Sequence, residues 1–243
     1  ATAVLVYILA RYSESRQVAC WAALLFLISF TALGQSAFVG SDSAAHFFLV
    51  GTALSLSNYS RSGELRWFTL ALLSAAVGIH AQYIGVILAP ALLASLCLYD
   101  SNQRLRCGVA RFWQLACHRQ SYLSLIAAGF VAALFLLPRL LEFHVIYTEK
   151  VQHGSLVRWH IDQPLYYAAG LVSSFSWPVV LLSLIGVVRG VCRAETRRAT
   201  IFYCLWMLDI LLFFSFLYTW KDIRFLLYLA VPLFLCAAHG LIY

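Results

Sequence analysis

Long apolar stretches separated by short polar breaks dominate this chain. Nine can be distinguished, and several approach the length of about 20 residues that an α-helix needs to cross a bilayer. They cover residues 1–10, 18–34, 44–57, 67–79, 84–99, 121–138, 164–188, 200–218 and 225–243. The third and fourth are short for full spans, so we expect their helices to extend into flanking residues, to tilt or to be re-entrant. The pattern predicts an all-α, polytopic transmembrane helical bundle with about nine membrane segments.

Composition supports this prediction. Hydrophobic residues make up 63% of the 243 residues and charged residues 11%, whereas soluble domains have about 45–50% and about 25%. We therefore expect one transmembrane domain over residues 1–243. Because the chain begins inside an apolar run without Met, we expect a piece of a longer protein that lacks a first span and a first outer loop.

The cations are distributed unequally between alternate loops. Counted this way, twelve of the 17 Lys and Arg residues lie on one side and five on the other. The positive-inside bias then makes the first side cytoplasmic, in a bacterial or archaeal plasma membrane or in the endoplasmic reticulum. The twelve are Arg11, Arg16, Arg61, Arg66, Arg104, Arg106, Arg111, Arg119, Arg189, Arg193, Arg197 and Arg198.

A polar island lies on the cation-poor side, between the last two apolar stretches. It contains Lys221, Asp222 and Arg224. Arg offers a bidentate fork and Lys a mobile point charge, so together they suit a phosphate. Arg139, directly after Pro138, could join them from another loop. The alternative is that these cations are helix ends that extend to the interface, with Asp222 as their counter-ion.

A second candidate is Asp42, which directly precedes an apolar stretch on the same side. One interpretation is a helix N-cap. The other is a carboxylate that takes a proton from an acceptor hydroxyl or binds a divalent cation. His46 lies one helical turn later and could share its face. We expect no metal site elsewhere and no certain cofactor.

Two further groups of polar and aromatic residues lie on this outer side. His80, Gln82 and Tyr83 form a short turn, and Trp159 and His160 come late in a long loop. We expect them to line a substrate cavity. They could equally satisfy helix ends or belong to the interfacial aromatic belt.

Three stretches together resemble one family of enzymes. Residues 41–48 (SDSAAHFF), residues 78–85 (GIHAQYIG) and residues 221–225 (KDIRF) with Pro232 are similar, in order, to motifs of GT-C class glycosyltransferases that use polyprenyl phosphates. The most similar subgroup is the dolichyl-phosphate-mannose protein mannosyltransferase and aminoarabinose transferase family. Gln82 stands where that family has a lysine.

The resemblance implies a GT-C-like fold and a function. Such an enzyme moves a sugar from a polyprenyl-phosphate donor to a hydroxyl of a lipid, glycan or protein acceptor at the outer or lumenal face. By similarity, Asp42 would serve the acceptor, and Lys221 and Arg224 would lie near the donor phosphate. Membrane lipids are the remaining expected partners, and no nucleic acid is expected.

Two other classes stay open from the residues alone. A secondary transporter or channel could use intramembrane carboxylates such as Asp209, because charged groups within spans often carry protons or ions. The prolines within the apolar stretches (Pro90, Pro178 and Pro232) show no paired half-repeats of the transporter type. A non-catalytic membrane scaffold is the third option.

Overall fold

The computed structural model describes residues 1–29, 41–62, 64–81, 162–212, 214–215 and 226–242, with separate positions between 126 and 141. Its regular elements are helices, and no β-strand occurs among these residues, which confirms the predicted all-α class for the described part. The helices are α1 (Thr2–Ser13), α2 (Arg16–Ile28), α4 (Ser41–Ser62), α5 (Leu65–Ala81), α9 (Asp162–Phe175), α10 (Trp177–Cys192), α11 (Arg197–Leu212) and α12 (Leu227–Ile242).

Most helices agree with the predicted apolar stretches. The two short stretches, 44–57 and 67–79, extend as expected into flanking residues, giving α4 22 residues and α5 17 residues. The stretch 84–99 lies outside the described residues. Only separate positions of 121–138 are described, and these are helical.

The stretch 164–188, predicted as one segment, is two helices. α9 ends at Phe175 and α10 starts at Trp177, with a bend of 104° between them. Ser176 joins them with a positive φ of 65°. Pro178, in the first turn of α10, explains the break. Inside a continuous helix its ring would clash with the preceding turn and its missing N–H would leave a hydrogen bond unmade, whereas in the first turn of a helix neither matters.

Length and apolar character together single out this bent pair. No single helix in the described part of the chain is long and apolar enough to cross a membrane, whereas the segments Tyr166–Phe175 and Trp177–Cys192 meet the requirement jointly.

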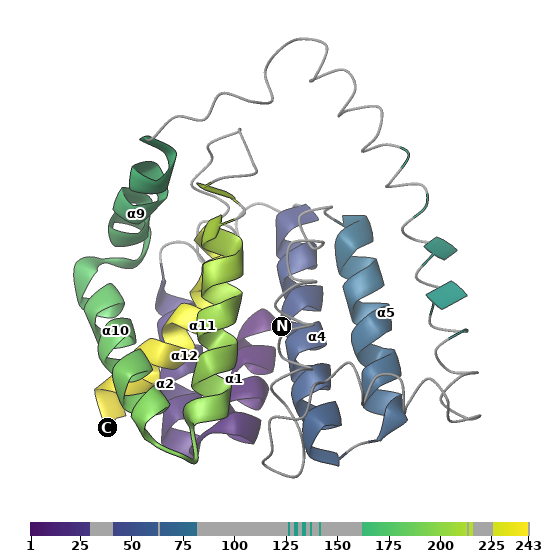
Figure 1. Ribbon diagram of the computed structural model, residues 1–243, viewed down its shortest axis with the longest axis horizontal. Helices are drawn as coiled ribbons and strands as arrows, with labels where there is room; N and C mark the ends of the chain where they lie inside the picture. Colours follow the sequence, from purple (N-terminus) through teal and green to yellow (C-terminus); the bar gives the residue numbers. More distant parts are fainter. Residues whose placement is uncertain are drawn as a thin grey trace.

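α12 forms the centre of the bundle. Every residue from Leu227 to Gly240 is buried, and the helix packs against α2, α4, α10 and α11. In Figure 1, α9 and α10 lie at one side of the molecule, α4 and α5 lie at the other, and α12 lies between. A helix that is apolar on all sides and buried on all sides is the core element that the others surround.

The α10–α12 contact brings two backbones together. A Cβ added to Gly186 would collide with the carbonyl group of Cys236, and one added to Gly240 would collide with the carbonyl oxygen of Leu182. Small residues at helix crossings allow this approach, as is common in membrane bundles.

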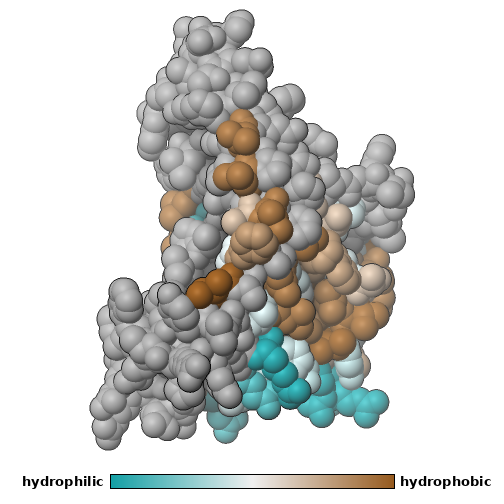
Figure 2. Space-filling view, turned by 90° about the vertical axis from the view of Figure 1, so that its right-hand side faces the viewer, coloured by the Kyte–Doolittle hydropathy of each residue, from teal (hydrophilic) through white to brown (hydrophobic). Residues whose placement is uncertain are grey.

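The described arginine-bearing turns gather at one end, called here the basic end. The turns α4–α5 and α10–α11 both lie at the bottom of Figure 1. The α1–α2 turn belongs with them, because Glu14 lies 3.5 Å from His239 near the end of α12, and Arg189 of α10 donates to the Gly240 carbonyl. Figure 2 shows hydrophilic residues at this end and hydrophobic side chains above it.

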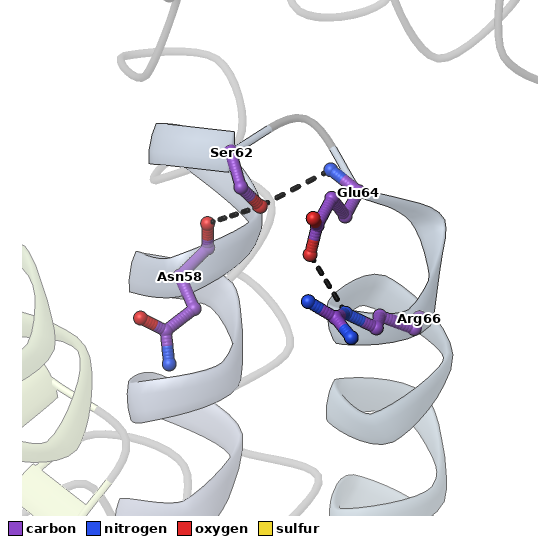
Figure 3. A network of polar contacts seen from close by, with 4 residues as sticks. All are labelled: Asn58, Ser62, Glu64 and Arg66. Carbon is purple, nitrogen blue, oxygen red and sulfur yellow. Dashed lines mark hydrogen bonds and ion pairs between the residues drawn. The ribbon is translucent and has the colours of Figure 1, made fainter.

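A small polar network fixes the α4–α5 turn at the basic end (Figure 3). The Ser62 hydroxyl donates to the Asn58 carbonyl at 3.0 Å and accepts from the Glu64 amide at 3.2 Å. Arg66 then donates its Nε–H to Glu64 at 2.7 Å. The exposed ion pair contributes little to stability, about 0–1 kcal/mol, but the turn orients α4 and α5 antiparallel.

Candidate active site

The candidate site lies at the end of the bundle opposite the basic end, where α4 begins. Helix α4 starts at Ser41, so Asp42 is its second residue rather than the N-cap that one interpretation expected. A carboxylate in the first turn complements the positive end of the helix dipole.

α5 ends beside the start of α4. A Cβ added to Gly78 would lie 3.2 Å from the Phe48 Cβ and 3.8 Å from the Ala45 carbonyl oxygen. Because α4 and α5 run antiparallel, the last turn of α5, which includes His80, is level with the first turn of α4. Asp42 and His80, which belong to different sequence motifs, thus lie on adjacent helix ends.

His46 lies one turn below Asp42 and is 2% exposed. Its ring centroid is 5.7 Å from that of Phe26 on α2 and 5.9 Å from that of Tyr228 on α12, the latter pair T-shaped. Within the described part of the chain, its Nε2 has no hydrogen-bond partner. His46 is therefore enclosed between α2, α4 and α12.

The enclosure is part of a larger aromatic cluster. Phe26 also contacts Phe234 of α12, with ring centroids 6.3 Å apart and edge-to-face, and Phe175 at the end of α9 contacts Phe234 at 5.5 Å. Such pairs contribute about 0.5–1.5 kcal/mol beyond their burial. The cluster of Phe26, His46, Phe175, Tyr228 and Phe234 therefore ties α2, α4, α9 and α12 together.

The start of α12 is the second element at this end. Tyr228, the partner of His46, is the second residue of α12. In the sequence, Lys221 and Arg224 immediately precede this helix. A ring contact thus joins α4, one turn after Asp42, to the first turn of α12.

Most of the other predicted site residues lie outside the described residues. These are Gln82, Tyr83, Arg139, Trp159, His160, Lys221, Asp222 and Arg224. Asp42 and His80 are placed by their backbone alone. Among the described residues, no group of three or more His, Cys, Asp or Glu side chains could hold a metal ion. A divalent cation at Asp42 stays a prediction.

Sequence reasoning missed the two rings that enclose His46. Tyr228 lies only four residues after Arg224 in the sequence, and this proximity could have drawn attention to it. Phe26 could not be recognised in this way, because nothing in the sequence distinguishes it from the other apolar residues of the stretch 18–34. Its role depends on the crossing of α2 with α4 and α12.

The described residues define a helical protein in which α4 begins with polar residues and packs, through His46, against the first turn of α12. Residues 1–111 match the sequence model of the family described as dolichyl-phosphate-mannose-protein mannosyltransferase. The match includes α1, α2, α4 and α5, and hence Asp42, His46 and His80, and it covers less than half of the chain. It supports the resemblance to GT-C glycosyltransferases. No curated protein and no solved structure matches the chain.

Proposed function

We propose that this chain is part of an integral membrane glycosyltransferase that transfers a sugar from a polyprenyl phosphate to a hydroxyl acceptor at the outer or lumenal face. The family match over residues 1–111 supports the reaction class. The observation that best supports this site is the His46–Tyr228 contact, because it joins α4, one turn after Asp42, to the helix that follows Lys221 and Arg224 in the sequence. In this proposal, the acceptor and donor groups belong to one end of the bundle.

In this reaction, the bond between the anomeric carbon and the phosphate oxygen breaks. The phosphate keeps the electron pair, and the sugar passes through a state with oxocarbenium character. Lys221 and Arg224, with Arg139 as a third cation, would stabilise the charge that grows on the leaving phosphate. Asp42 would accept the proton of the incoming hydroxyl as the new glycosidic bond forms.

The remaining site residues have supporting roles in this proposal. His80, Gln82, Tyr83, Trp159 and His160 would line the cavity for sugar and acceptor, and Asp222 would hold Lys221 and Arg224 in place. The burial of His46 favours a positioning role over contact with substrate, because an enclosed ring supports the first turn of α4 from below.

The proposed binding of the donor phosphate by Lys221 and Arg224, called here the donor clamp, can be tested in membranes that contain the full-length protein. Lys221→Ala and Arg224→Ala are each expected to lower sugar transfer from a radiolabelled polyprenyl-phosphate sugar at least about 100-fold, the scale of losing a donor that stabilises transition-state charge. Asp42→Asn should lower turnover with donor binding retained. A panel of lipid-linked sugars would identify the donor.

The matched control is Arg66→Ala, an exposed arginine at the basic end, which should leave turnover unchanged. Wild-type turnover in both Lys221→Ala and Arg224→Ala, at equal protein level, would refute the clamp.

A further inference from the structure

Helix α10 has two faces of different chemistry. Ser183, Gly186 and Gly190 are buried, and Gly186 lies against α12. The other face is apolar and exposed: Trp177 is 66% exposed, Leu184 60% and Val188 64%. The fully buried positions of α10 thus carry small residues, while several large apolar side chains point away from the protein, which is unusual for a helix on a soluble domain.

The exposed residues form one continuous stripe. Trp177, Leu181, Leu184, Val188 and Val191 recur at alternating intervals of four and three residues, which places them along one side of the helix. From Trp177 to Val191 the stripe is about 21 Å long at 1.5 Å per residue. α10 lies at the edge of the molecule in Figure 1, so a long apolar ligand can approach the stripe from outside.

The stripe ends at the α10–α11 turn, which is rigidly built. Arg197 donates its Nε–H to the carbonyl of Val191, the last residue of the stripe, at 2.7 Å. The Thr196 hydroxyl donates to the Gly190 carbonyl at 3.1 Å, and the Arg197 amide donates to the Arg193 carbonyl at 2.9 Å. The guanidinium of Arg197 is therefore held directly at the end of the apolar stripe.

The charges of this turn are arranged for an anion. Residues 189–198 contain four arginines and one acidic residue, Glu195, and Arg193 and Arg197 are both exposed. Arg197 and Arg198 open α11, and its first turn has no acidic residue. Cations at a helix N-terminus oppose the helix dipole, so this placement does not serve the helix itself. Instead, the two arginines add their positive charge to the partial positive charge of the helix N-terminus.

We propose that the α10 stripe and the α10–α11 turn bind one anionic glycerophospholipid. Its acyl chains lie along Leu184 and Val188, and its phosphate lies between Arg193 and Arg197. Charge complementarity selects an anionic headgroup, and the apolar stripe distinguishes a lipid from a soluble phosphate. The inference rests on the membrane location in the proposed function, but not on the sugar-transfer chemistry.

Native mass spectrometry of the full-length protein tests the site. The protein is equilibrated in mild detergent with phosphatidylglycerol and phosphatidylcholine of identical acyl chains, and the retained lipids are counted. The wild type should retain phosphatidylglycerol preferentially. Arg197→Gln should lower this retention about fivefold, the scale expected for one arginine at a lipid surface, and Arg193→Gln should lower it further.

The matched control is Arg66→Gln, since Arg66 is exposed at the same end but is already paired with Glu64. It should retain phosphatidylglycerol like the wild type. A photoreactive acyl chain on phosphatidylglycerol should label the peptide containing Leu184 and Val188 in the wild type. Unchanged thermal denaturation of Arg197→Gln in detergent would show that its fold is intact.

Three outcomes would overturn the proposal: equal retention by Arg197→Gln and the wild type, equal losses in Arg197→Gln and Arg66→Gln, or displacement of the lipid by glycerol phosphate at the same concentration. Recovery of the protein without detergent would instead refute the membrane location. Sugar transfer should survive Arg197→Gln, so failure of the lipid site and failure of the catalytic proposal are distinguishable.

Discussion

At the scale of single residues, His46 shows how burial changes the interpretation of a motif residue. It lies in the stretch that resembles the glycosyltransferase motif, one turn after Asp42. In the structure it is 2% exposed and contacts Phe26 and Tyr228. A ring enclosed in this way holds helices together, so its effect on catalysis would act through the position of the first turn of α4.

Two substitutions of His46 separate packing from chemistry. His46→Phe keeps the ring and removes a buried nitrogen without a hydrogen-bond partner, so the free energy of unfolding should change by less than about 1 kcal/mol. His46→Ala should lower it by about 2–4 kcal/mol because the ring contacts are lost. Denaturant titration in detergent measures both values.

Turnover of the same two variants completes this test. His46→Phe should keep sugar transfer within a few-fold of the wild type. A complete loss of transfer in a stable His46→Phe protein would show that the imidazole itself takes part in the reaction.

At the scale of elements, the packing of α10 on α12 depends on glycine. Gly186→Ala should lower the free energy of unfolding by about 1–3 kcal/mol or more, because the added methyl group meets the Cys236 backbone rather than a flexible side chain. The matched control is Gly129→Ala, where nothing lies within 4 Å of the added atom. Its helical position should make the change neutral or stabilising by about 0.5–1 kcal/mol. Equal effects at both positions would contradict the close crossing.

The Glu14–His239 pair is a second contact between elements. Its side chains are 3% and 4% exposed and lie 3.5 Å apart, whereas Arg66 and Glu64 form an exposed pair at 2.7 Å. A double-mutant cycle with Glu14→Ala and His239→Ala should give a coupling energy of about 1–3 kcal/mol. The same cycle for Glu64 and Arg66 should give less than about 1 kcal/mol. A coupling no larger in the buried pair would show that it does not connect the α1–α2 turn to α12.

At the scale of the whole molecule, the described arginine-bearing turns lie together at the basic end. If the bundle spans a membrane as proposed, the two ends face opposite compartments. In a single-cysteine background, Cys192 and Glu64→Cys should react with an impermeant maleimide only from the cytoplasmic side. Tyr166→Cys on α9 should react only from the other side. Labelling of Cys192 and Tyr166→Cys from the same compartment would contradict the proposed orientation.

Helix positions could be predicted from the sequence because apolar length and polar breaks are local properties. Extension was one of the outcomes predicted for the stretches 44–57 and 67–79, and α4 and α5 are indeed longer than these stretches. The break at Ser176 was missed because hydropathy continues through it, although Pro178 was a visible signal. Of the candidate site, the sequence predicted that Asp42, His46 and His80 lie on the same side of the membrane. The order of the motifs could not show which of them is enclosed.

What the sequence by itself determined is the helical class, the approximate extent of the described helices and the separation of the described arginine turns from the helix ends that bear Asp42 and His80. Only the tertiary structure decided which face of each helix is buried. In an apolar bundle, surfaces facing lipid and surfaces facing protein are equally hydrophobic, so periodicity does not distinguish them. On α10 the small residues are inside and Leu184 and Val188 are outside. His46 and Glu14 find their partners on α12 because of how the helices cross, which no local pattern encodes.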